Sequence, residues 1–97
     1  MIQRDYDIVI IGAGPAGIAA AIQLKRTGID FQILEKDRIG GLLWHANFVE
    51  NYPGFPSGVS GPDLVKCFKL HLKQLNIEVQ KTDVKKVKYL NKEFFLR

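Results

Sequence analysis

Residues 6–27, "YDIVIIGAGPAGIAAAIQLKRT", constrain the fold more than any other stretch of this 97-residue sequence. The first six residues form a continuous β-rich run, as expected of a strand that is covered on both faces in a parallel sheet. The alanine-rich run that follows has Pro15 in its first turn and Gly28 just beyond its last turn, which are start and stop signals of a helix. The sequence therefore predicts a strand over 6–11, a glycine-rich turn, and a helix from Pro15.

The rest of the chain continues an α/β pattern. Residues 31–35, "FQILE", predict a second strand, which completes a βαβ unit whose crossover should be right-handed. A third strand is predicted over 77–80, and a β-hairpin over 84–89 and 93–97. A turn at Asn91 and Lys92 joins the two hairpin strands. These elements predict one α/β domain with a parallel sheet, spanning residues 1–97.

Residues 60–76 predict a second helix that is amphipathic. Ser60 and Asp63 form a plausible capping arrangement at its start, and Asn76 can end it. Its apolar residues fall on one stripe, which is expected to face the core: Leu64, Phe68, Leu72 and Leu75. Before this helix, residues 36–61 lack clear periodicity. A connection of that length inside a compact domain indicates a functional loop.

The turn "GAGPAG" at 12–17 fits the pattern GxGxxG. Gly12 permits a tight turn, Gly14 lets the backbone approach a pyrophosphate, and Gly17 lets the helix pack close to the strand. Phosphates would then lie on free N–H groups at the positive end of the helix dipole. Glu35, at the end of the second strand, is placed to accept ribose hydroxyls and to repel a 2′-phosphate. The motif predicts FAD or NAD binding, and the alternative is a glycine turn that only packs.

Ala21 and Gly28 extend this pattern to GxGxxGxxxAxxxxxxG, which resembles the N-terminal fingerprint of two-dinucleotide flavoproteins and favours FAD over NAD. With the segments "ILEK", "GG" at 40–41 and "VENYPGFPSGVSGP" at 49–62, the chain resembles the start of the thioredoxin reductase family of FAD-dependent pyridine nucleotide-disulfide oxidoreductases. This resemblance covers essentially all 97 residues. It implies a Rossmann-like FAD/NAD(P)-binding domain, of which this chain is an incomplete, N-terminal portion.

The resemblance also implies a set of cofactor-binding residues. The glycine turn and the double glycine would line the pyrophosphate and the ribityl chain, residues at the end of the second strand would face the ribose, and two further positions would reach the flavin ring and the adenine. In that order these are Gly12, Ala13, Gly14, Pro15, Ala16, Gly40, Gly41, Glu35, Lys36, Asn51 and Val84. Family resemblance also favours a homodimer. A cytoplasmic location is expected because the apolar run 8–22 is broken by glycines and follows acidic residues rather than a basic leader.

Two departures from the family pattern stand out. Many members have glutamine after the double glycine, whereas this chain has Leu42. The redox-active CxxC pair is also missing, since Cys67 is the single cysteine. The NAD(P)H-binding domain that follows this segment in the family is missing as well. NAD(P)H is thus expected only in a longer parent, and no catalytic residue is predicted within these residues. The rival hypotheses are a non-catalytic nucleotide-binding or assembly module and an inactive truncated fragment.

Other residue types give weaker signals. The net charge of +4 comes from lysines scattered after residue 65, a pattern typical of a solvated face rather than a nucleic-acid site. His45 and His71 are too isolated for a metal site, although His45 is a candidate neighbour of the flavin. Cys67 is expected to pack inside the fold. The four loop aromatics are expected mainly to fill the core or an interface, with flavin contact as the alternative: Trp44, Phe48, Tyr52 and Phe55. No membrane span is expected.

Overall fold

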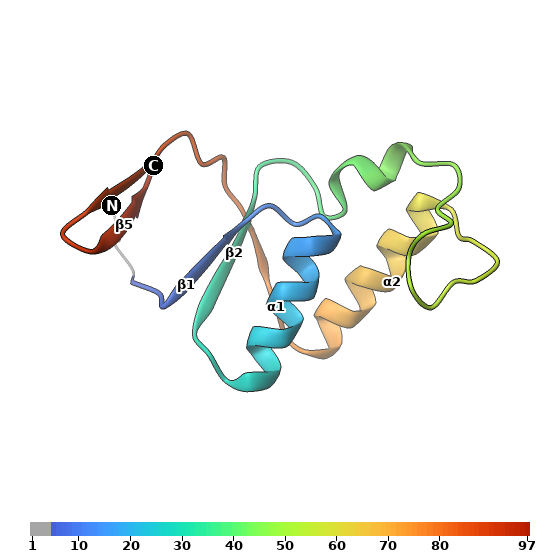
Figure 1. Ribbon diagram of the computed structural model, residues 1–97, viewed down its shortest axis with the longest axis horizontal. Coiled ribbons are helices and arrows are strands. Elements are labelled where there is room, and N and C mark those ends of the chain that lie inside the picture. Colours follow the sequence, from blue (N-terminus) through green and yellow to red (C-terminus); the bar gives the residue numbers. More distant parts are fainter. Residues whose placement is uncertain (1–4) are drawn as a thin grey trace.

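The computed structural model describes residues 5–97 and contains two sheets and two α-helices (Figure 1). Strands β1 (Ile8–Ile11), β2 (Phe31–Glu35) and β3 (Val79–Lys81) form a parallel sheet in the order β1-β2-β3. Strands β4 (Val87–Leu90) and β5 (Glu93–Leu96) form a separate antiparallel hairpin. The α/β class, the parallel sheet and the hairpin are therefore confirmed.

Helix α1 (Pro15–Thr27) has the predicted bounds. Pro15 lies in its first turn, where no backbone N–H is needed, and Gly28 beyond its end adopts φ 75°, a left-handed conformation that glycine takes without a Cβ clash. The side chains of Ile18 and Ala21 are buried against the sheet side of the core. Sequence signals local to this helix thus sufficed to place both of its ends.

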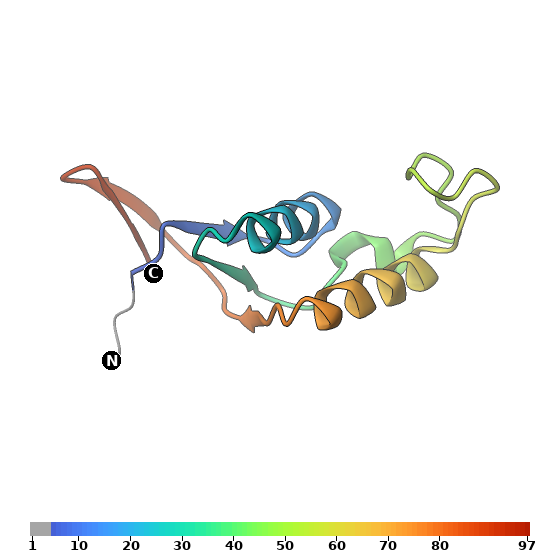
Figure 2. The ribbon, with the colours of Figure 1, turned by 90° about the horizontal axis from the view of Figure 1, so that it is seen from below.

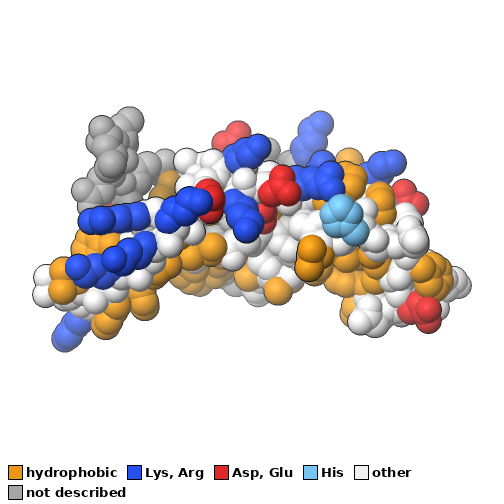
Figure 3. All heavy atoms as spheres, turned by 90° about the horizontal axis from the view of Figure 1, so that it is seen from above, with side chains coloured by type: hydrophobic (Ala, Val, Ile, Leu, Met, Phe, Trp, Pro, Cys, Tyr) orange, Lys and Arg blue, Asp and Glu red, His pale blue; other side chains and the backbone are white. Residues whose placement is uncertain are grey.

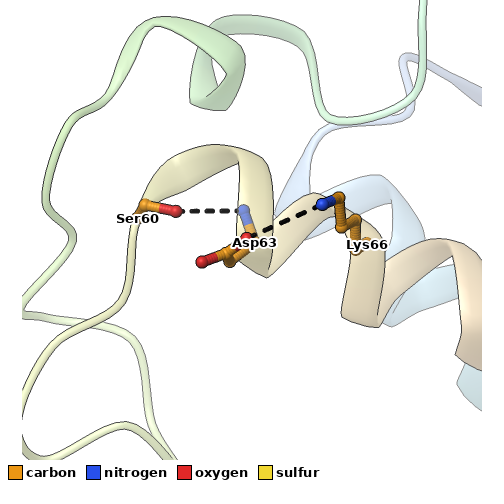
Figure 4. Close-up of polar contacts among 3 residues, drawn as sticks. All are labelled: Ser60, Asp63 and Lys66. Carbon is orange, nitrogen blue, oxygen red and sulfur yellow. Dashed lines mark hydrogen bonds and ion pairs between the residues drawn. The ribbon is translucent and has the colours of Figure 1, made fainter.

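Helix α2 (Gly61–Gln74) begins at the predicted cap. The Oγ of Ser60 accepts a hydrogen bond from the backbone N–H of Asp63 at 3.2 Å, and Lys66 lies 3.9 Å from the Asp63 carboxylate on the exposed side (Figure 4). The helix ends in a Schellman arrangement, in which Asn76 has φ 55° and the N–H of Ile77 donates to the carbonyl of Leu72. Because Ile77 takes part in this helix cap, it does not belong to the third strand. Strand β3 begins at Val79, two residues later than the predicted strand 77–80.

The core lies between the helices and the sheet. Leu64, Phe68 and Leu72 of α2 are buried as the apolar stripe predicted, and Ile33 of β2 is fully buried with them. Helices α1 and α2 run side by side, and α1 contacts both β1 and β2 (Figure 1). This arrangement brings the beginning of α1 close to the ends of β1 and β2.

The first strand is shorter than the sequence predicts. It begins at Ile8 instead of Tyr6, because its partner β2 begins at Phe31, the residue in register with Ile8. The hairpin turn is as predicted, with Asn91 at φ 53° and Lys92 at φ 64°, the left-handed conformations of a two-residue hairpin loop. The hairpin strands themselves are shorter than the predicted runs at 84–89 and 93–97.

The connection 36–60 is more ordered than its sequence predicts. It contains a 3-10 helix, η1 (Gly41–His45), and an antiparallel bridge between Val49 and Val59 that closes a protruding loop. Figure 2 shows this loop and the β4–β5 hairpin at opposite ends of the molecule, whose extents are 48 × 28 × 22 Å. Helix α1 and the glycine turn lie between these two ends.

Candidate functional site

The turn between β1 and α1 is shaped by Gly12 and Gly17. Gly12 has φ 107°, and its N–H donates to the carbonyl of Leu34 on β2 at 2.7 Å. A Cβ placed on Gly17 would lie 2.1 Å from the Gly12 carbonyl oxygen, which is backbone and cannot move aside. Gly12 thus makes the turn and Gly17 permits the close approach of α1, as the motif predicts.

Gly14 differs from these two glycines because the space beside it is open. A Cβ on Gly14 would have no atom within 4 Å, and its φ of −81° suits any residue. The first bond of the α-helical ladder at this end runs from the N–H of Ile18 to the carbonyl of Gly14 at 3.0 Å, and Pro15 has no N–H. The N–H groups of Ala16 and Gly17 in the first turn are therefore not used by the ladder. Free N–H groups at a helix N-terminus, with open space beside Gly14, fit a bound phosphate.

Glu35 is fastened to this turn by both carboxylate oxygens. Its Oε1 accepts the N–H of Ala13 at 2.9 Å, and its Oε2 accepts the N–H of Asp37 at 2.9 Å. These two backbone donors, with Ala13 the stronger, lower the pKa of the Glu35 carboxyl, with Lys36 adding a smaller effect. The side chain is half-buried, so lone pairs remain that a ribose hydroxyl could use.

The bond between Ala13 and Glu35 was not foreseen from the motif. The sequence predicts that Ala13 lines the pyrophosphate, whereas its side chain is fully buried and its N–H is already bonded to Glu35. Its carbonyl is bonded as well, accepting the N–H of Gly40 at 2.8 Å. Ala13 therefore supports the turn from within the core. The N–H groups that remain free to bind a ligand lie further along the turn, at Ala16 and Gly17. No local sequence pattern signals these two long-range bonds.

The structure brings most of the predicted site residues together. The residues of the glycine turn, Glu35 and Gly40 are joined by the hydrogen bonds given above. Lys36 is exposed next to Glu35, and Gly41 is half-buried with open space beside it at φ 53°. The N–H of Thr82 donates to the Glu35 carbonyl at 2.9 Å, so half-buried Val84 follows a segment that is fixed to the same strand end.

Asn51 lies apart from this cluster. It is exposed in the protruding loop, and in the described part of the chain its side chain has no hydrogen-bond partner. The loop itself is held by the two hydrogen bonds between Val49 and Val59, and by Tyr52, whose ring packs edge-on against Phe68 at 5.3 Å. The loop that carries Asn51 is thus anchored to α2, while Asn51 itself faces outward.

Most of the four loop aromatics pack within the fold, as the sequence predicts. Tyr52 and Phe55 pack against the core, whereas the Phe48 side chain is 57% exposed. The indole N–H of Trp44 donates to the carbonyl of Ile39 at 2.7 Å, and the Arg38 guanidinium lies 4.6 Å from the ring centre. Trp44 is thereby fixed beside the residue that precedes Gly40.

The prediction for Cys67 was wrong. Its thiol is exposed, because Cys67 lies on the face of α2 away from the buried stripe. His71 is exposed on the same helix, and His45 is exposed at the end of η1. Over residues 5–97 no group of three or more histidine, cysteine or acidic side chains is arranged to hold a metal ion. Neither described helix is both long and apolar enough to cross a membrane.

The chain is similar to known proteins over most of its length. Residues 9–54 match the family model of pyridine nucleotide-disulphide oxidoreductases. The thioredoxin reductase of Mycoplasma genitalium is 43% identical over 91 residues, which cover 94% of this chain and 29% of that protein.

Solved structures give the same result. The T. acidophilum thioredoxin reductase superposes with a TM-score of 0.83 at 36% identity, over 98% of this chain and 31% of that one. A ferredoxin-flavin thioredoxin reductase from Clostridium acetobutylicum superposes with a TM-score of 0.88 at 36% identity, over 98% of this chain and 33% of that one. The chain thus spans about a third of the length of these proteins. The resemblance and the Rossmann-like fold expected from the sequence are confirmed.

The anchored carboxylate predicts a pH dependence of stability. Because the folded-state pKa of Glu35 is lowered, its ionised form stabilises the fold above the unfolded-state pKa, and this contribution is lost as the pH falls through the folded-state value. Glu35→Gln should lower the free energy of unfolding at pH 7 by about 1 kcal/mol, a modest figure for a charge-assisted bond that is partly open to solvent. Urea unfolding between pH 3 and pH 7 measures this.

Glu50→Gln is the matched control, since Glu50 is exposed and makes no hydrogen bond within the described residues. The stability difference between wild type and Glu35→Gln should shrink toward acid pH, while the control follows the wild type throughout. A difference that stays constant from pH 7 to pH 3 would show that the Glu35 carboxylate does not stabilise the turn in its ionised form.

Proposed function

We propose that this thioredoxin-reductase-like chain binds FAD, as the FAD-binding part of an oxidoreductase that passes electrons between NAD(P)H and a disulfide or other acceptor. The observation that carries the proposal is the open patch of free N–H groups at the start of α1, next to the anchored carboxylate of Glu35. The names of the similar proteins support it, since they are thioredoxin reductases and one is a ferredoxin-flavin enzyme.

The residues present fit the adenosine diphosphate half of FAD. The N–H groups of Ala16 and Gly17 and the open space at Gly14 suit the pyrophosphate, which the helix dipole would also stabilise. The Glu35 carboxylate suits the ribose hydroxyls, with Lys36 on the same side. We assign the adenine to backbone groups near Val84. When bound, the flavin supplies hydride and electron transfer, and the protein supplies binding and orientation.

Glu35 also gives the site a preference among dinucleotides. Its lowered pKa means that the carboxyl is ionised at neutral pH. A negative charge at the ribose repels a 2′-phosphate, so we expect FAD or NAD to bind in preference to NADP. At the other end of the cofactor we assign Gly41 to the ribityl chain and Asn51 to the flavin ring.

One structural feature favours a second function, assembly with further polypeptide. Large apolar side chains are exposed on β1 and on the hairpin: Ile8, Ile11, Val87, Tyr89, Leu90, Phe94 and Phe95. Figure 3 shows hydrophobic and basic side chains side by side at the hairpin end. Exposed apolar surface of this kind is typical of an interface. A homodimer is part of this proposal on the basis of family resemblance, and a cytoplasmic location is part of it on the basis of the sequence before the glycine turn.

FAD binding by the chain is tested with Gly14→Ala. The added methyl group would meet no protein atom but would occupy the space proposed for the pyrophosphate. We expect FAD affinity to fall by about tenfold or more, which corresponds to about 1.4 kcal/mol, while the thermal midpoint stays close to wild type. Flavin fluorescence titration measures affinity, and circular dichroism measures stability.

Two controls accompany this titration. ADP should compete with FAD, because most of the proposed contacts are to the adenosine diphosphate half, and riboflavin should bind more weakly than ADP. Gly28→Ala changes a glycine that also has open space but lies at the far end of α1, so FAD affinity should be kept. A wild-type chain that ignores added FAD would contradict the proposed function for this chain.

We also predict that the purified chain has little or no disulfide reductase activity. Reduction of a disulfide by way of a flavin needs a positioned nicotinamide and a redox-active pair of thiols. These 97 residues contain one cysteine, Cys67, on the surface of α2. NADPH oxidation followed at 340 nm with a disulfide acceptor provides the assay, and turnover above the rate of a blank reaction would contradict the prediction.

A further inference from the structure

The segment 40–46 is held between the glycine turn and helix α2. At its start the N–H of Gly40 donates to the Ala13 carbonyl at 2.8 Å. At its end the Ala46 carbonyl accepts the N–H of Gly61, the first residue of α2, at 2.8 Å. The segment therefore connects the beginning of one helix to the beginning of the other.

Neither of these two contact points leaves room for a side chain. A Cβ on Gly40 would lie 2.4 Å from Cγ2 of Val65, which is fully buried on α2, and Gly40 has φ 98°. A Cβ on Gly61 would lie 1.7 Å from the Leu43 carbonyl oxygen. The segment is fixed at both ends by glycines that allow backbone to touch the neighbouring element.

The bond from Gly40 determines the orientation of one peptide group in the glycine turn. The peptide between Ala13 and Gly14 is planar and trans, so its C=O and N–H point in opposite directions. Because the Ala13 carbonyl is directed at the Gly40 N–H, the Gly14 N–H must point away from Gly40. The N–H of Ala13 itself is held by Glu35 at 2.9 Å, so the two peptide groups that flank Ala13 are each fixed by a hydrogen bond.

We propose that Gly40 is a positioning residue for the pyrophosphate site, which orients the Gly14 N–H through the Ala13 carbonyl and does not itself line the cofactor. This inference rests on the proposed function. It assigns Gly40 a different role from Gly41, beside which the space is open. Val65 takes part indirectly, because its packing on Gly40 keeps the Gly40 N–H within reach of the turn.

Gly40→Ala should weaken FAD binding. The new methyl group collides with Val65, which moves the Gly40 N–H away from the Ala13 carbonyl and releases the Ala13–Gly14 peptide. We expect affinity for FAD to fall by about tenfold. Val65→Ala in the same chain removes the colliding methyl groups, so the double variant should recover part of the lost affinity.

Gly28→Ala is the matched control for backbone strain. Gly28 also has positive φ, 75°, with nothing within 4 Å of an added Cβ, and it lies at the far end of α1. Both variants should lose stability from the left-handed conformation, but only Gly40→Ala should lose FAD affinity. Dissociation constants are measured by flavin fluorescence at a temperature where circular dichroism shows every variant to be fully folded.

The outcomes separate this inference from the function on which it rests. Gly40→Ala that binds FAD as tightly as Gly28→Ala overturns the positioning role and leaves FAD binding intact. A wild-type chain without FAD affinity overturns both. If Gly40→Ala does not fold, Val65→Ile extends a side chain toward Gly40, and it should bind FAD more weakly than Val79→Ile on β3. Equal affinity of these two variants would overturn the positioning role.

Discussion

Two hydrogen bonds to the backbone of Ala13 hold the site together. Glu35 accepts the Ala13 N–H from the end of β2, and Gly40 donates to the Ala13 carbonyl from the segment before α2. The glycine turn and the segment that runs from the end of β2 to Gly40 thus meet at one buried alanine. Because the partner in one bond is an ionised carboxylate, that bond is stronger than a neutral one. The free N–H groups at the start of α1 are useful to an anion only while this junction keeps the turn in place.

The rest of the structure depends on this junction to different degrees. Helix α2 is tied to it through Gly40 and Val65, and the protruding loop is tied to α2 through Tyr52 and Phe68. The β4–β5 hairpin lies at the end of the molecule opposite the protruding loop, and most of its apolar side chains are exposed. The nucleotide end of the proposed site is therefore built from well-packed elements. The exposed hairpin offers surface for association with other polypeptide.

The sequence predicted those features that depend on local chemistry. Helix α1, strand β2, the Ser60 cap and the two-residue turn of the hairpin each follow from residues within a few positions of one another. Contacts between residues that are not neighbours in sequence were not predictable in this way, which is why the bridge that closes the loop and the bond from Ala13 to Glu35 were missed. The exposure of Cys67 was missed because its residue type, which is usually buried, was given more weight than its position away from the buried stripe of α2. The comparisons confirm the family resemblance, and the roles of individual site residues stay predictions.

The central claim is that the backbone N–H groups at the start of α1 bind the pyrophosphate of FAD. Amide chemical shifts of the ¹⁵N-labelled chain, recorded during titration with FAD, test it most directly. The account predicts that the largest shifts fall on Gly14, Ala16 and Gly17, with little change at Gly28 at the other end of the helix. Shifts confined to the hairpin, or none at all, would contradict it.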